Sequence, residues 1–366
     1  MNTKRRLIIG AAAAVLLVAA SASLGSSPIS PIDTVLILAH KFFRIPLADR
    51  INPQNVSIVW LLRLPRVLLA FLAGGCLAMS GAITQSVLRN PLASPYILGV
   101  SSGASLGAGL VIISGFSLAI SGSLAFIGSL TLPLAGFACG LAAVFTVVAL
   151  SEKIDKNVSS NTIILFGMVF SLFINALLTT LCAIFSDDLK RIVLWQMGSF
   201  AMKGWRYVFV LLPFFIIGTI GVMRYSRELD ILSFGDEQAK SAGVEAGSVR
   251  KKLLGISAVL TGSVVALSGI IGFVDLIAPH AARKIIGNRH AYLLPMSFIT
   301  GGSLMAVTDL LARTIISPSE LPVGALTAII GAPFFAWVYF RKRNNAPHQL
   351  HNAPPQLHNA PAQENQ

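Results

Sequence analysis

Long apolar runs alternate with short polar stretches along most of the chain. Ten apolar segments can be drawn, each bounded by charged or turn-forming residues. They cover residues 7–24, 64–86, 94–114, 124–149, 161–185, 207–223, 252–271, 273–287, 292–312 and 322–340. A helix needs about 20 apolar residues to cross the hydrocarbon core of a membrane. The pattern therefore predicts an all-α, polytopic membrane protein of about ten transmembrane helices.

The eighth segment, 273–287, is the weakest of the ten, because Asp275, Pro279 and Arg283 interrupt it. We nevertheless count it as a span, because leaving it out would make the number of spans odd and would reverse the orientation of the last two. With the N-terminus inside, eighteen of the 28 Lys and Arg residues fall on the cytoplasmic side. Because cytoplasmic loops collect Lys and Arg, we expect both termini in the cytoplasm.

The two ends of the chain differ from this regular pattern. Lys4-Arg5-Arg6 and the apolar run after it also fit a secretory signal peptide, but the many spans that follow favour an uncleaved first helix. Near the C-terminus Asn-Ala-Pro recurs at 345, 352 and 359, and a Pro in every unit cannot sustain a helix. We therefore predict a transmembrane domain, 1–343, and a disordered tail, 344–366.

An internal repeat is visible when the chain is shifted by 188 residues. LAGGCLAMSGAITQSVLRNP, residues 72–91, then lies over LTGSVVALSGIIGFVDLIAP, residues 260–279. The first copy would run from outside to inside and the second from inside to outside, so the repeat is inverted. Inverted repeats with Pro-interrupted helices are a recurring transporter architecture. A match by composition alone between two small-residue helices is the alternative.

The composition agrees with a membrane protein and argues against several other classes. Hydrophobic residues make up 54%, charged residues 12%, and the mean hydropathy is +0.75, beyond what a soluble core requires. The net charge of +13 does not indicate nucleic-acid binding, because the basic residues lie between apolar spans. The sequence contains no CxxC, phosphate-loop or HExxH motif. We expect no enzyme activity, no cofactor and no metal site in this chain.

Polar residues of interest lie at the ends of the segments. Arg63 and Arg66 share a helix face at its outer end, and Arg313 follows Asp309 by one turn. Such arginines either bind carboxylates of an external partner or anchor the helix at the interface, and spacing alone favours anchors. The loop at 225–252 suits a short helix stopped by Gly243, either a docking element or a solvated connector.

Five stretches carry a more specific pattern. They are RLPR at 63–66, SGAITQSVLRNPLASPYILGVSSGA at 80–104, GDEQAKSAGV at 235–244, SGIIGFVDLIAPHAAR at 268–283, and DLLAR through ELPVGALTAIIGAPFF at 309–335. In this order they resemble the FecCD/BtuC-type permease family, the membrane subunits of type II ABC importers for iron chelates, haem and cobalamin. The resemblance covers nearly the whole chain except the tail.

The resemblance implies a ten-helix subunit that forms a homodimer or heterodimer in the inner membrane of a prokaryote. It also implies two cytoplasmic ATPase subunits, which bind ATP, and an extracytoplasmic binding protein that delivers substrate. In the family, certain positions meet acidic residues of the binding protein, and the residues here that match them are Arg63, Arg66 and Arg313. The resemblance therefore favours docking over membrane anchoring for these arginines. Residues matching the ATPase coupling helices are Gly235, Asp236, Glu237, Gln238, Ala239 and Gly243. Residues matching the cytoplasmic gate are Asn90, Leu92, Ser160 and Asn161.

Two features depart from the family pattern: Asp275 stands where the family usually has a small or apolar residue, and the repeat tail is not a family feature. We expect a permease that moves an iron(III) chelate by alternating access, with haem or cobalamin as the alternative substrate. The rival from another class is an ion-coupled secondary transporter, which the inverted repeat fits equally well. That rival would depend on Asp275 or Asp309, the carboxylates within apolar segments.

Overall fold

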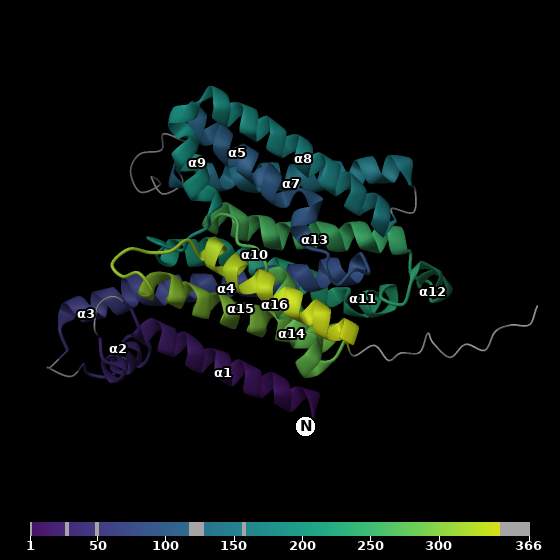
Figure 1. The fold of residues 1–366 in the computed structure, drawn as a ribbon. Helices are drawn as coiled ribbons and strands as arrows, with labels where there is room; N and C mark the ends of the chain where they lie inside the picture. Colours follow the sequence, from purple (N-terminus) through teal and green to yellow (C-terminus); the bar gives the residue numbers. More distant parts are fainter. Residues whose placement is uncertain (1, 26–28, 48–50, 117–127, 156–158, 345–366) are drawn as a thin grey trace, which may run out of the picture.

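The computed structural model describes residues 2–25, 29–47, 51–116, 128–155 and 159–344, with side chains up to residue 336. Every regular element within these ranges is a helix (Figure 1). The predicted disordered tail lies outside the described residues, apart from Asn344, which ends the last helix.

Each of the ten predicted segments corresponds to a helix. The helices are α1 (Thr3–Ser23), α4 (Leu64–Val87), α5 (Val100–Ser114), α7 (Thr131–Ile154), α8 (Ser160–Ile184), α10 (Trp205–Arg224), α13 (Ala246–Ser268), α14 (Val274–Ile286), α15 (His290–Thr314) and α16 (Val323–Asn344). Seven helical runs in the described part of the chain are long and apolar enough to span a membrane. Of the other three, α5 has 15 residues and α14 has 13, so the weak eighth segment is indeed a short helix.

Several shorter helices lie between these ten. They are α2 (Pro31–Phe43), α3 (Pro53–Ser57), the 3₁₀ turn η2 (Pro95–Leu98), the 3₁₀ turn η4 (Ser186–Asp188) with α9 (Leu189–Gln196), α11 (Ser226–Leu232) and α12 (Asp236–Ser241). The sequence predicted α12 and missed α2, α3, α9 and α11. Figure 1 shows α12 at one end of the bundle and α2 with α3 at the other, and we call these the α12 end and the α2 end.

The entrance to α4 differs from the prediction. Helical backbone begins at Pro53 and passes through a π-helical turn, η1 (Ile58–Arg63), directly into α4. Pro65 therefore lies inside a continuous helical run and not at its first turn. A π turn shifts the hydrogen-bond register and often marks functional sites. Here it immediately precedes the predicted docking residues Arg63 and Arg66.

Helix α4 is the centre of the molecule. It is buried along nearly its whole length and packs against α15, α13, α14 and α10. The crossing with α15 is close because a Cβ on Gly74 would come within 2.3 Å of the Gly301 carbonyl oxygen. Small residues at such crossings let helix backbones approach in membranes. The small-residue run of the sequence is therefore a packing surface.

Helix α13 separates two layers. On one side lie α5, α7 and α8, and on the other lie α4, α15 and α1 (Figure 1). Its contact with α4 includes buried hydroxyls, with Ser80 Oγ 2.6 Å from Ser257 Oγ and Thr84 Oγ1 2.9 Å from the same oxygen. Ser80 also contacts Thr261, so α4 and α13 run in opposite directions.

The opposite directions of α4 and α13 confirm the inversion expected for the two repeat copies. The copies differ at the aligned pair Gly81 and Gly269. Gly81 lies inside α4, whereas Gly269 ends α13 with φ of 78°, a conformation that favours glycine. The second copy is therefore a broken helix, with α14 beginning at Val274.

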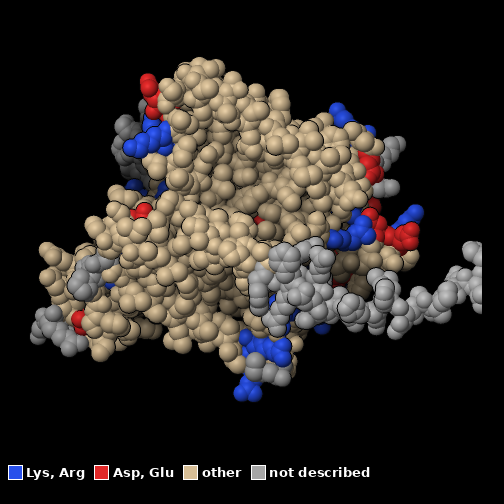
Figure 2. Space-filling model, viewed as in Figure 1, with Lys and Arg blue, Asp and Glu red and all other residues tan. Residues whose placement is uncertain are grey.

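Charge is distributed as a membrane protein requires. On the face shown in Figure 2, Lys, Arg, Asp and Glu gather at the two ends, and the band between them is almost free of charge. Aromatic rings gather at the α2 end, where the centroids of Trp60 and Trp205 are 5.1 Å apart and Phe42 packs on Trp60 at 5.5 Å. Trp residues are enriched at membrane interfaces, which places one interface at this end.

Candidate docking, coupling and gate sites

Arg66, at the α2 end, is held by two carboxylates. Its Nε and Nη2 donate to Asp309 Oδ1 at 3.0 and 2.8 Å, and its Nη1 donates to Glu320 Oε1 at 2.7 Å. The Asp309 side chain is fully buried, whereas that of Glu320 is 35% exposed. Paired hydrogen bonds from one guanidinium to one carboxylate are both strong and directional. Arg66 is therefore held by one buried carboxylate, Asp309, and by one partly exposed carboxylate, Glu320.

Arg63 and Arg313 bind the last turn of α1. Arg63 Nη1 donates to the Ser23 carbonyl oxygen at 2.7 Å, and Arg313 Nη2 donates to the Ser21 carbonyl oxygen. The last carbonyl groups of a helix lack partners within the helix, and basic side chains commonly satisfy them. Both arginines thus help to tie α1 into the bundle.

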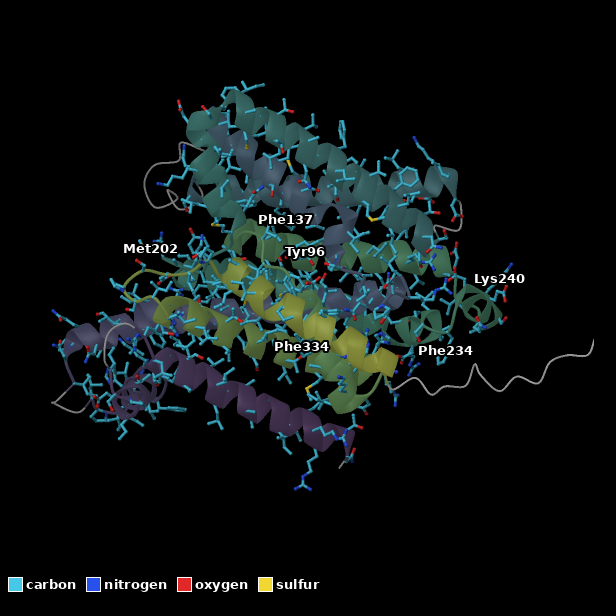
Figure 3. All side chains as sticks on the ribbon, in the orientation of Figure 1. Tyr96, Phe137, Met202, Phe234, Lys240 and Phe334 are labelled. Carbon is cyan, nitrogen blue, oxygen red and sulfur yellow. The ribbon has the colours of Figure 1, made fainter. Side chains whose placement is uncertain are left out.

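The three predicted docking arginines do come together, around a cleft of about 360 Å³. Lys203 and Glu320 also line it, and burial lowers the pKa of Lys203. Met202, at the rim, is 97% exposed and lies at the α2 end in Figure 3. The sequence predicted the pairing of Asp309 with Arg313, whose closest atoms are 3.8 Å apart. It did not predict the contacts of Arg66.

At the opposite end of the bundle, α12 has the predicted form. Gly235 precedes it with φ of 125°, Asp236 begins it, and Gly243 follows with φ of 77°. Asp236 Oδ1 accepts from Arg250 Nη2 at 2.7 Å, and the Arg250 side chain is 1% exposed. Ala239 is buried, whereas Glu237, Gln238 and Lys240 are exposed (Figure 3 labels Lys240). One face of α12 is therefore packed against the protein, and the opposite face is exposed.

Phe234 lies beside the exposed face of α12 and is itself 76% exposed. A large apolar side chain exposed next to a charged helix is the kind of residue that protein interfaces bury. Sequence reasoning did not single it out, because an apolar residue before Gly235 reads equally well as a core position. The exposure of Phe234 strengthens the docking interpretation of the loop over that of a solvated connector.

A buried polar network connects this end to the bundle centre. Asp230 Oδ1 lies 2.6 Å from His290 Nδ1, and His290 Nε2 lies 2.6 Å from Ser86 Oγ. Arg283 contacts Ser86 and the amide oxygen of Gln85. The network joins α11 to α15, α4 and α14. It could not be predicted from the sequence, because residues that contact each other in it are up to 204 positions apart.

The predicted gate residues lie at the exit of α4 and at the start of α8. Asn90 Oδ1 caps the turn by accepting from the Leu92 amide at 2.9 Å, and Leu92 is 49% exposed. Ser160 is buried and Asn161 is exposed in the first turn of α8. The exposed Leu92 and Asn161 give this surface both apolar and polar groups. A gating role for the four residues stays a prediction.

Asp275, the departure from the family pattern, is buried in the first turn of α14. It is 1% exposed, and one carboxylate oxygen accepts from Ser94 Oγ. Its carbonyl oxygen lies against Gly81, where a Cβ would approach to 1.8 Å. The residue thus joins α14 to α4 and to the turn before η2.

The chain belongs to the FecCD transport family, which matches residues 13–341. It is 42% identical to an uncharacterized ABC transporter permease, YvrB of Bacillus subtilis, over 80% of this chain and 81% of that protein. It is 40% identical to the hemin transport permease HmuU of Yersinia pestis, over 78% and 84%. A solved inward-facing structure described as a metal-chelate type ABC transporter superposes with a TM-score of 0.76, covering 92% of this chain and 99% of that one at 30% identity. The protein is a permease of an ABC importer, an assembly that includes ATPase partners.

Proposed function

We propose that this permease carries an iron(III) chelate across the cytoplasmic membrane. The observation that carries the proposal is the set of relatives at 33–39% identity, which includes permeases named for Fe(3+) dicitrate, Fe(3+)-citrate and iron(3+)-hydroxamate. Relatives named for hemin and cobalamin support these as the alternative substrates. The binding protein would select the substrate, because all of these ligands are bulky and the permease offers largely small and apolar side chains.

The substrate proposal is tested on the binding protein encoded with the permease. Purified binding protein would be titrated with ferric citrate, a ferric hydroxamate, haem and cobalamin, and each dissociation constant measured. We expect a ferric chelate to bind at least about 100-fold more tightly than haem or cobalamin, a difference of about 2.7 kcal/mol. Preference for haem or cobalamin would reject the iron proposal and leave the permease function intact.

In the proposed assembly the α12 end faces the cytoplasm and the α2 end faces the binding protein. The predicted cytoplasmic location of both termini supports this orientation. Two copies, or one copy with a related subunit, would form the path, and α12 of each would rest on one ATPase subunit. Closure of the ATPase pair would move α12, and the network through Asp230 and His290 would pass that movement to α4.

The first prediction concerns docking at the α2 end. Lys203 lines the arginine cleft without joining the ion pairs around Asp309, so Lys203→Glu changes the cleft charge with little effect on those pairs. We expect it to weaken association with the binding protein about tenfold at low salt, and less at high salt, because electrostatic steering and attraction are screened. Association would be measured on the permease–ATPase complex in nanodiscs.

Lys190→Glu is the matched control, since Lys190 is an exposed lysine on α9 that does not line the cleft. It should leave the dissociation constant within about twofold of the wild type. Equal effects of the two substitutions would mean that net charge, and not the cleft, governs docking.

The second prediction concerns coupling at the α12 end. Phe234→Ser should weaken association with the ATPase subunit by about 2 kcal/mol, the typical contribution of an aromatic anchor, without lowering the melting temperature. Phe43→Ser is the control, because Phe43 is 78% exposed on α2. Copurification of the ATPase with each variant measures the effect. Full retention of the ATPase by the Phe234 variant would exclude this residue from the interface.

A further inference from the structure

We propose that Glu320 is an internal placeholder on Arg66, which a carboxylate of the docking protein displaces. The inference rests on the proposed docking function of the arginine cleft and adds the regulation of that site. Its basis is the difference between the two carboxylates that hold Arg66. Both are supplied by the chain itself, and they differ in burial, in geometry and in the element that carries them.

Asp309 is built as a permanent partner. It projects from α15, its side chain is fully buried, and it receives three hydrogen bonds from Arg66 as well as facing Arg313. Removing a buried carboxylate from such a position would leave guanidinium groups without their counter-charge. Asp309 therefore keeps Arg66 oriented, with its Nη1 directed to the cleft.

Glu320 is built as an exchangeable partner. It lies on the segment between α15 and α16, and its side chain is 35% exposed. Among the residues that the structure describes, its carboxylate accepts one hydrogen bond, from Nη1 of Arg66. An exposed ion pair changes an equilibrium constant by no more than about fivefold. A carboxylate from another protein can therefore take its place at small cost.

The charge of the cleft favours such an exchange. Within the described part of the chain, the cleft has four basic residues and two acidic ones. The basic residues are Arg63, Arg66, Arg313 and Lys203, and the acidic ones are Asp309 and Glu320. An excess of positive charge remains while Glu320 is in place, and it attracts an acidic partner. Because Nη1 of Arg66 already donates a hydrogen bond to Glu320, an incoming carboxylate must compete with Glu320 for that atom.

The placeholder has consequences for the bundle as well. The segment that carries Glu320 is tied to α15 through the Leu321 amide, which donates to the Ala312 carbonyl oxygen at 2.9 Å. It is tied to the turn before α10 through the Val323 amide, which donates to the Gly198 carbonyl oxygen at 3.1 Å. Displacement of Glu320 would therefore act on the segment that leads into α16.

The test is Glu320→Gln in the full permease–ATPase complex in nanodiscs, titrated with the binding protein encoded with the permease. The amide keeps the size of the side chain and removes its charge, so the variant should bind the partner about fivefold more tightly at low salt. The difference should disappear at about 1 M salt. A fold defect would weaken binding, so a gain in affinity cannot arise from damage to the structure.

Asp187→Asn is the matched control, because Asp187 is an exposed carboxylate on η4 that does not line the cleft. It should leave the affinity unchanged. Unchanged or weaker binding by the Glu320 variant would overturn the placeholder. If Lys203→Glu weakens docking in the same assay, that failure belongs to the placeholder alone; if neither substitution has an effect, the docking function of the cleft fails.

Discussion

Asp309→Asn is expected to lower the free energy of unfolding by about 3 kcal/mol. The fully buried carboxylate accepts three hydrogen bonds from Arg66 and lies 3.8 Å from Arg313. The amide removes the negative charge and leaves two guanidinium groups close together in a buried site. Because Arg313 also holds the end of α1, the loss should extend to the packing of the first helix.

The measurement is thermal unfolding of the purified permease in nanodiscs, followed by intrinsic fluorescence or by light scattering. Glu320→Gln is the control at the same site, and its cost should stay below about 1 kcal/mol because the Glu320 pair is exposed. A melting temperature of the Asp309 variant equal to that of the wild type would show that the arginine cluster does not depend on its buried carboxylate.

Gly81→Ala should be the most damaging of the small substitutions in α4. A Cβ at this position would lie 1.8 Å from the Asp275 carbonyl oxygen, and backbone cannot move aside as a flexible side chain can. Overpacking of this kind costs about 3 kcal/mol. Helix α14 would be pushed away from α4, so we expect loss of transport together with loss of stability.

Gly255→Ala separates this effect from the general replacement of a helical glycine. Gly255 lies in α13, and its Cβ would meet only Phe145, at 3.9 Å. Since Ala favours the helix over Gly by about 1 kcal/mol, this variant should be as stable as the wild type or slightly more stable. Transport by the Gly81 variant at the wild-type rate would contradict the close packing of α14 on α4.

The spanning helices could be predicted from the sequence because each is long and apolar. The short helices α2, α9 and α11 could not, because helices of 7–13 residues are too short to be recognised as membrane spans. The inverted direction of the repeat followed from parity and from one alignment. The break between α13 and α14 was predicted as the boundary between segments 252–271 and 273–287, and in the structure α13 ends at Ser268 and α14 begins at Val274.

The candidate sites were predicted only in part, for a similar reason. Arg63, Arg66 and Arg313 could be grouped by the side of the membrane on which they fall. The partners of Arg66 lie 243 and 254 residues away, and one sequence contains no signal for a contact at that separation. The network of Asp230, His290 and Ser86 was invisible in the same way, whereas α12 could be predicted because its caps are local.

Transport in proteoliposomes distinguishes an ATP-driven permease from an ion-coupled transporter. The permease would be reconstituted with and without its ATPase partner, and uptake of ferric citrate, ferric hydroxamate, haem and cobalamin delivered by the binding protein would be followed. We expect one of these ligands to accumulate only when the ATPase subunit and ATP are both present. Accumulation driven by an ion gradient in the absence of the ATPase subunit would contradict this expectation.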